Sequence, residues 1–289
     1  EQRQEEKREQ VQQIPIDELH PFTNHPFKVV DDEAMTRTVE SIAQFGVLAP
    51  LIARPRPDGD GYEIISGHRR QFAAKMAGLE TLPVIVRDMD DDAATILMVD
   101  SNLQREHISP SERAFAYKMK MDAMKRTAGR PPKENPRQVV GNFETADLIG
   151  KESGESGRQV QRFIRLTNLI PELLDMVDEK KVSFNPAVEL SYLDVEEQKD
   201  LSYYIDEGEA TPSLAQAIQM KKLSQAGVLT EERIEAILSE EKPNQKPIIK
   251  VPMERIQKYF SPDASVQEIE DTIVKALSAY RRSQELQMA

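Results

Sequence analysis

The sequence predicts an α+β protein: a small N-terminal α/β unit, then an all-helical region with a helix-turn-helix, then a mostly helical C-terminal region. Three observations support this fold class. Strand and amphipathic helix patterns alternate over the first hundred residues. Helix patterns fill most of the remainder, and glycines separate two of them at helix-turn-helix spacing. The 289 residues are enough for two or three domains.

The N-terminal unit is expected at residues 11–108, after a charged arm at residues 1–10. Its strand patterns lie at residues 11–16, 50–54, 62–66 and 82–86. Two amphipathic helix patterns lie between them, at residues 31–45 and 67–77, and each is followed by a glycine. The turn-rich sequence HPFTNHPF separates the first strand from the first helix. This alternation predicts a small mixed sheet covered by helices.

A glycine-led motif stands where a strand runs into a helix, at Gly67-His68-Arg69-Arg70. Glycine lets a ligand approach the backbone, the helix start presents free N–H groups, and the arginines add positive charge. The motif therefore predicts a phosphate site, although a helix start with two surface arginines would look the same. A second polar cluster follows at residues 100–106, where a solvated helix face is the alternative.

Residues 145–166 have the pattern of a helix-turn-helix inside a helical region expected at residues 109–227. Gly150 and Gly154 suit the helix contact and the turn, and Ser156 can cap the second helix. The positions expected to face outward on that helix are Gly157, Arg158, Gln159, Gln161, Arg162 and Arg165. Arginine and glutamine read purine edges, and arginine grips phosphate. With Ser156 they predict a face for double-stranded DNA; a helical hairpin with a solvated basic face is the alternative.

The charge distribution agrees with a DNA-binding centre. The net charge is −12, but residues 113–165 carry twelve basic and six acidic side chains. A basic centre between acidic flanks is typical of a DNA-binding module inside an acidic protein. The charged N-terminus, the absence of cysteine and the lack of an apolar run near ~20 residues lead us to expect a cytoplasmic protein without a membrane partner.

The order of the motifs resembles that of the ParB family of plasmid and chromosome partition proteins. GHRR is followed by SNLQRE at residues 101–106 and SPSERA at residues 109–114. The family carries a G-E-R-R box, then an E-N-x-Q-R box, then a helix-turn-helix. Residues 46–54, GVLAPLIAR, are similar to its earlier G-x-x-Q-P box, with Ala49 in place of glutamine. The resemblance covers about residues 11–193.

The resemblance implies a ParB/sulfiredoxin-like N-terminal domain in a CTP-dependent, dimeric DNA clamp. The residues that it implies for nucleotide binding are Gly46, Pro50, Arg54, Gly67, His68, Arg69, Arg70, Asn102, Gln104 and Arg105. Asn102 would also help to place Mg²⁺, which prefers oxygen ligands. The implied partners are a specific DNA site, a second copy of the chain and a ParA-type ATPase. The implied setting is a nucleoid or plasmid, in segregation of a chromosome, plasmid or mobile element.

Two positions depart from the family boxes: His68 and Ser101 each replace a glutamate. A hydroxyl is a poorer ligand than a carboxylate for a hard cation, and it cannot act as a general base near neutral pH. We therefore expect CTP to bind and to be hydrolysed weakly or not at all, and we assign no catalytic residue.

Other functions remain open from the sequence. The same N-terminal fold occurs in sulfiredoxin, whose chemistry needs a cysteine that this sequence lacks, and in a free-serine kinase. The helix-turn-helix argues against a phosphotransferase of that kind. A plain helix-turn-helix transcriptional repressor would bind DNA without nucleotide. Residues 228–289 end in a helical stripe at positions 266, 269, 273, 277 and 280, which predicts self-association or packing within the chain.

Overall fold

The computed structural model describes residues 10–29, 31–105, 108–127, 137–208, 210–240, 256–260, 268–269 and 272–278. The chain forms two compact units, Glu1–Glu240 and Glu241–Ala289. The charged arm up to residue 9 and positions 266 and 280 of the predicted C-terminal stripe lie outside the described residues. The described part of the second unit includes a short 3-10 helix, Gln257–Tyr259. None of the described helices combines the length and apolar character that crossing a membrane requires.

A five-stranded mixed sheet forms the base of the first unit. Its strands are β1 Val11–Pro15, β2 Leu19–His20, β3 Leu51–Pro55, β4 Tyr62–Ser66 and β5 Thr81–Val86, in the order β1-β5-β3-β4-β2. The pairs β1–β5 and β3–β4 are antiparallel, whereas β3–β5 and β2–β4 are parallel. Four strands lie close to their predicted positions. The two-residue β2 was not predicted, because it is too short for a strand pattern and runs into the turn-rich segment at His20.

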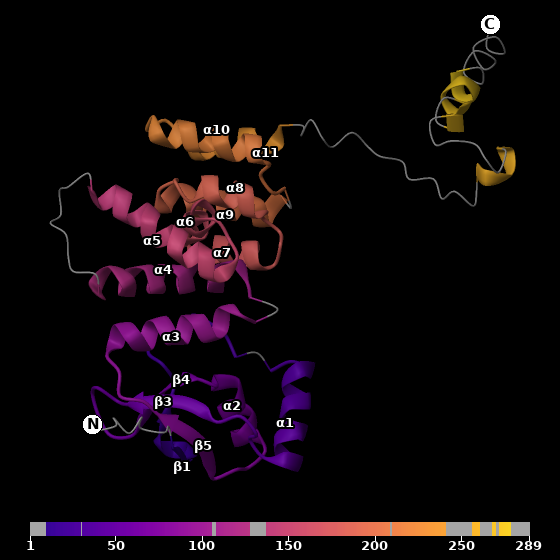
Figure 1. Cartoon of the computed structure of the whole chain (residues 1–289). Coiled ribbons are helices and arrows are strands. Elements are labelled where there is room, and N and C mark those ends of the chain that lie inside the picture. The colour runs from indigo at the N-terminus through magenta and orange to yellow at the C-terminus, as the bar shows by residue number, and fades with distance from the viewer. Residues whose placement is uncertain are drawn as a thin grey trace, which may run out of the picture. The chain divides into compact units, whose positions relative to one another are not determined.

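Helices cover both faces of this sheet (Figure 1). Helices α1 Glu33–Phe45 and α2 His68–Met76 pack on one face, and α3 Asp91–Leu103 packs on the other. The neighbouring residues Ile64 and Ile65 of β4 show this division, because successive side chains of a strand point to opposite faces. Ile64 joins the core that contains Met35 and Ala73, and Ile65 joins the core that contains Met98. Both isoleucines are fully buried.

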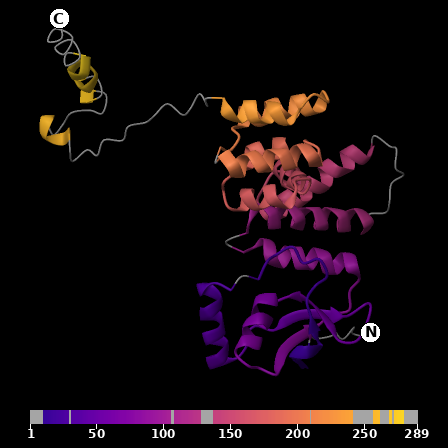
Figure 2. The ribbon, with the colours of Figure 1, turned by 180° about the vertical axis from the view of Figure 1, so that it is seen from behind.

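The helices that follow α3 in the first unit pack together (Figure 2). Their buried side chains form one large core. Its helices are α4 Pro110–Thr127, α5 Arg137–Ser153, α6 Gly157–Leu166, α7 Pro171–Asp178, α8 Phe184–Leu190, α9 Val195–Gly208, α10 Leu214–Gln225 and α11 Glu231–Ser239. Ile234, Ile237 and Leu238 of α11 lie in this core, so the helical part does not end at residue 227 as expected. Ala116 of α4 lies in the same core as Ile65 of β4 and Met98 of α3, so no boundary between compact units falls at residue 108.

A buried ion pair fastens β3 to β4. Arg54 donates from Nε and NH2 to Glu63 Oε2 at 2.8 and 2.7 Å, and both side chains are at most 7% exposed. The other carboxylate oxygen of Glu63 accepts the backbone N–H and the hydroxyl of Thr23. Arg54 also contacts Asp91 at the start of α3. Buried charges need this degree of pairing and hydrogen bonding to be tolerated.

Replacing Arg54 tests how far the sheet depends on this pair. Arg54→Met leaves the Glu63 carboxylate buried without a cation, so we expect the free energy of unfolding in urea to fall by about 3–5 kcal/mol. The matched control is Arg37→Met, which removes an exposed ion pair with Glu33. That control should cost at most about 1 kcal/mol. Equal losses in the two variants would contradict a structural role for Arg54.

Candidate functional site

Gly67 opens α2 in a conformation that other residues rarely adopt. Its φ is +111°, and a Cβ atom there would lie 2.7 Å from Leu51 Cγ and 3.2 Å from Arg70 NH2. Gly67 is also the N-cap residue, and no side chain caps the first turn of α2. The N–H groups at this helix start are therefore suited to an anion, as the glycine-led motif predicted.

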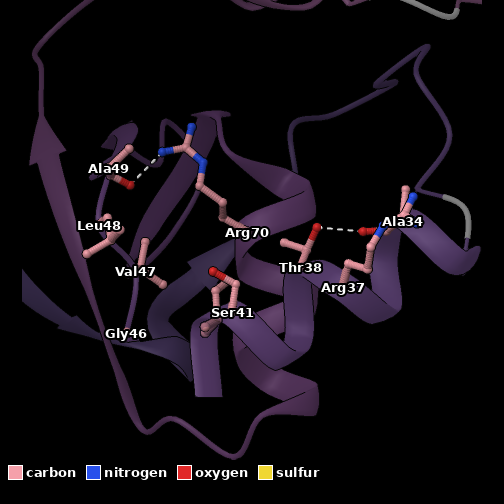
Figure 3. A pocket seen from close by; sticks show the side chains of 10 residues that line it. Ala34, Arg37, Thr38, Ser41, Gly46, Val47, Leu48, Ala49 and Arg70 are labelled. Atoms are coloured by element: carbon pink, nitrogen blue, oxygen red, sulfur yellow. Dashed lines mark hydrogen bonds between the residues drawn. The ribbon is translucent and has the colours of Figure 1, made fainter. Parts of the chain in front are cut away.

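Arg70 organises a pocket of about 440 Å³ between α1 and the loop that follows it (Figure 3). Its NH1 donates to the carbonyl oxygens of Ala49 and Pro50 at 2.6 and 2.8 Å. Gly46 ends α1 with a φ of +70° and lines the same pocket, with Ser41 from α1. The structure thus brings Gly46, Pro50 and Arg70 together, as predicted. Two hydrogen bonds of Arg70, however, hold the loop after α1.

Arg69 and Arg105 form a second positive site. Arg69 NH2 lies 3.5 Å from Asp32 Oδ1, and Arg105 sits over the Phe27 ring, 5.4 Å from its centroid. Burial lowers the pKa of Arg105, the charge of Glu112 opposes that change, and the charge of Arg69 adds to it. The two guanidinium groups therefore repel each other. An anion beside them would relieve that repulsion.

His68 lies beneath this site without adding positive charge. Its side chain is buried, and its Nε2 accepts the Phe22 N–H at 3.2 Å. Its ring centroid is 4.0 Å from that of His25. Burial, followed by the charges of His25 and Arg105, lowers the pKa of His68 to about 3. His68 is therefore neutral at neutral pH and supports the segment after β2, so we assign it to the scaffold.

The second polar cluster ends α3. Asn102 is 4% exposed, and its Nδ2 donates to the Met98 carbonyl at 2.8 Å. Ser101 donates to the same carbonyl, and Gln104 is exposed. The Asn102 amide oxygen can serve as one ligand of a magnesium ion that phosphates also hold. Among the described residues, no group of three histidine or acidic side chains could hold a metal ion without such help.

The helix-turn-helix is formed by α5 and α6. Gly154 makes the turn with a φ of +74°, and a Cβ atom on Gly150 would lie 2.6 Å from the Glu155 carbonyl oxygen. Ser156 caps α6, because its hydroxyl accepts the Gln159 N–H at 3.2 Å. The outward placement of Gly157 was wrong. Gly157 is buried against α5, where a Cβ atom would lie 2.7 Å from the Asp147 nitrogen.

The predicted DNA-binding side chains of α6 differ in how far hydrogen bonds to other parts of the protein hold them. Arg158 is exposed and Gln161 is half-buried. Arg162 donates to Gln159 Oε1 at 3.2 Å and to Asn185 Oδ1 of α8 at 2.6 Å. These contacts leave Arg162 at the edge of the face, with its position set by α8.

Arg165 is held by hydrogen bonds to the end of α8. It donates to the hydroxyl and the carbonyl of Ser191 at 3.1 and 2.8 Å, and its guanidinium lies 3.8 Å from the Tyr192 ring centroid. Lys221 of α10 lies 3.7 Å from the same ring centroid. We therefore assign Arg165 to the scaffold of the face. Asn185 and Lys221 were missed, because nothing in their local sequence connects α8 or α10 with α6.

The segment after β2 was also missed as part of the site. His25 Nδ1 lies 2.8 Å from the Phe27 carbonyl oxygen, and Phe27 packs beneath Arg105. The Lys28 N–H donates to Glu112 Oε1 of α4 at 2.7 Å. This segment thus touches α2, the end of α3 and the start of α4. Its turn-rich composition carried no signal of these contacts.

The sequence of this chain is similar to those of known proteins. Residues 1–103 match the ParB N-terminal domain. The N-terminal part of the chain is thus a ParB N-terminal domain. The chromosome-partitioning protein Spo0J of Thermus thermophilus is 32% identical over 188 residues, which cover 65% of this chain and 62% of that protein. The chain thus spans less than two thirds of the length of this ParB relative.

Two solved structures of C-terminally truncated ParB from Caulobacter crescentus are also similar. One is complexed to the centromeric parS site, with 24% identity, a TM-score of 0.42, and coverage of 74% of this chain and 99% of that chain. The other is complexed with CTP-gamma-S, with 26% identity, a TM-score of 0.32, and coverage of 68% and 99%.

The depressed pKa of His68 predicts a loss of stability in acid. The unfolded chain takes up a proton on this histidine below about pH 6.5, whereas the folded protein resists protonation down to about pH 3. Stability from this group is therefore complete above pH 6.5 and falls as the pH drops, by up to about 1.4 kcal/mol per pH unit. Urea unfolding at pH 7.5, 6.0 and 5.0 measures the slope.

His68→Gln should flatten this pH dependence, because glutamine can accept the Phe22 N–H without a titrating ring. His20→Gln is the matched control, because it replaces a histidine of β2 in the same N-terminal sheet. Equal slopes in His68→Gln and the wild type would show that the His68 pKa is not lowered in the folded protein.

Proposed function

We propose that this chain is a ParB-family protein: a sequence-specific DNA-binding partition protein and a CTP-switched, dimeric DNA clamp. The observation that carries the proposal is one compact unit with a cationic, uncapped helix start and a helix-turn-helix with exposed arginine. The first feature suits a nucleotide phosphate, and the second suits duplex DNA. Segregation of a chromosome, plasmid or mobile element, with a ParA-type ATPase as partner, follows from the family.

The nucleotide would lie across the start of α2. Arg69 and Arg105 are placed to bind its phosphates, and the pocket beside Arg70 offers room for the rest of the molecule. Asn102 would hold Mg²⁺, which supplies positive charge to the phosphate oxygens when bound. Because Ser101 offers only a hydroxyl in this cluster, we propose that CTP acts mainly as a bound ligand, with weak hydrolysis or none.

The DNA would lie against α6. Arg158, Gln159, Gln161 and Arg162 would form its DNA-binding face, and the helix N-terminus that Ser156 caps would meet a phosphate. Arg165 supports this face through Ser191. A transcriptional repressor without nucleotide would share α6, so nucleotide binding separates the two functions.

Calorimetry with CTP, ATP and GTP in the presence of Mg²⁺ tests the nucleotide site. We expect CTP to bind most tightly, and Arg69→Ala to weaken it about tenfold or more, because a hydrogen bond to a charged group contributes about 1.5–3 kcal/mol. Lys75→Ala, on another face of α2, is the matched control and should bind normally. Absence of nucleotide binding by the wild type would favour the plain repressor.

The DNA face is tested at Arg158. If Arg158 contacts a base edge, Arg158→Ala should lose about 1–3 kcal/mol of affinity for the DNA site recovered by genome-wide mapping, and less for scrambled DNA. Fluorescence anisotropy gives both affinities. Lys199→Ala on α9 removes an exposed cation away from α6 and serves as the control. Unchanged affinity of Arg158→Ala for the recovered site would contradict this placement of the DNA.

A further inference from the structure

One buried cation contacts a helix from each candidate site. Lys120, in the middle of α4, is 1% exposed, and its Nζ donates to Asp100 of α3 and to Glu152 of α5. Burial lowers the pKa of Lys120, but the hydrogen bonds and charges of the two carboxylates outweigh this effect and raise it. Lys120 is therefore charged at neutral pH. The ammonium group depends on these two carboxylates, because an isolated buried charge is very unfavourable.

The two carboxylates are placed next to the functional motifs. Asp100 precedes Ser101 and Asn102 at the end of α3. Glu152 lies in the last turn of α5, just before the Gly154 turn that leads into α6. A change at the nucleotide site that shifts the end of α3 would therefore act on Asp100 directly. A change in the helix-turn-helix would act on Glu152.

The exposure of the three side chains makes this contact exchangeable. The Lys120 side chain is 2% exposed, whereas those of Asp100 and Glu152 are 42% and 59% exposed. Either carboxylate can exchange its contact with Lys120 for water, but Lys120 cannot do the same. If one carboxylate moves away, the other becomes the main partner of the cation. Ion-pair energies change steeply with distance where water is excluded.

We propose that Asp100, Lys120 and Glu152 form an ion triad that couples the nucleotide and DNA sites, with Lys120 as the positioning residue. The inference rests on the proposed function, because it requires both ligands to bind. Nucleotide binding would shift Asp100 relative to Lys120, and the changed pull on Glu152 would alter how α5 presents α6. The coupling must be reciprocal, so DNA would change nucleotide affinity by the same factor.

A second ion pair between the same helices provides the control. Arg126 of α4 contacts Asp92 of α3 at 2.6 Å, and the Arg126 side chain is 59% exposed. This pair also joins α3 to α4, but neither residue contacts α5 through an ion pair among the described residues. Removing it weakens the same helix contact and leaves the triad intact.

The test measures DNA affinity with and without CTP in the chain of 289 residues. Couplings between sites are typically about 5–150-fold. In the wild type, CTP should change DNA affinity by a factor in this range. We expect Glu152→Gln and Asp100→Asn each to reduce this coupling factor to less than about twofold, while Arg126→Met keeps it. Each carboxylate variant leaves Lys120 one charged partner, so the fold should persist, and urea unfolding checks this. A merely structural triad would change the unfolding curve and leave the coupling factor unchanged.

The outcomes are distinguishable. The coupling role is overturned if CTP changes the DNA affinity of Glu152→Gln by the same factor as that of the wild type. It is also overturned if Glu152→Gln and Arg126→Met reduce this factor equally. The proposed function stands in both cases. Independent binding of CTP and DNA by the wild type would overturn the coupling role as well. If the wild type binds no CTP, the proposed function fails, and the coupling fails with it.

Discussion

The packing of α4 on two sides is the constraint on which both functional sites depend. Its residues Ala114, Tyr117 and Met121 lie in the helical core, while Ala116 lies in the core beneath α3. Helix α4 keeps an exposed stripe that includes Lys118, Asp122 and Arg126, whereas the cationic Lys120 lies on its buried side and contacts Asp100 and Glu152. The glycine-led motif and the helix-turn-helix therefore belong to one compact unit, and residues of α4 contribute to the cores on both sides of that helix.

Local pattern was enough to predict most elements of the fold. The β4, α1 and α2 patterns have clear periods and are followed by glycines, and the Ser156 cap follows from residues three positions apart. The boundaries at residues 108 and 227 could not be predicted in this way. They depend on which core buries α4 and α11, and that is decided by contacts between distant segments.

The arginines show the same limit within the sites. Each was predicted as a ligand contact from its motif, but Arg54, Arg70 and Arg165 donate to groups of the protein itself. Their acceptors lie nine, twenty-one and twenty-six residues away, so no local pattern reveals them. Arg69 and Arg158 keep more freedom, because no carbonyl or buried carboxylate reaches them among the contacts of the described residues. The fold thus sorts one residue type into scaffold and ligand-binding groups.

The contacts of three acidic side chains, Asp32, Asp100 and Glu112, support the proposal of a bound ligand rather than a rapidly consumed substrate. Asp100 is engaged with Lys120, and Asp32 accepts the Met35 N–H and faces Arg69. Glu112 accepts two backbone N–H groups at the start of α4. A general base needs a carboxylate that can approach the attacking water, and these three already hold the fold. Among the described residues, Asp32, Asp100 and Glu112 therefore have structural contacts that an attacking water would have to displace.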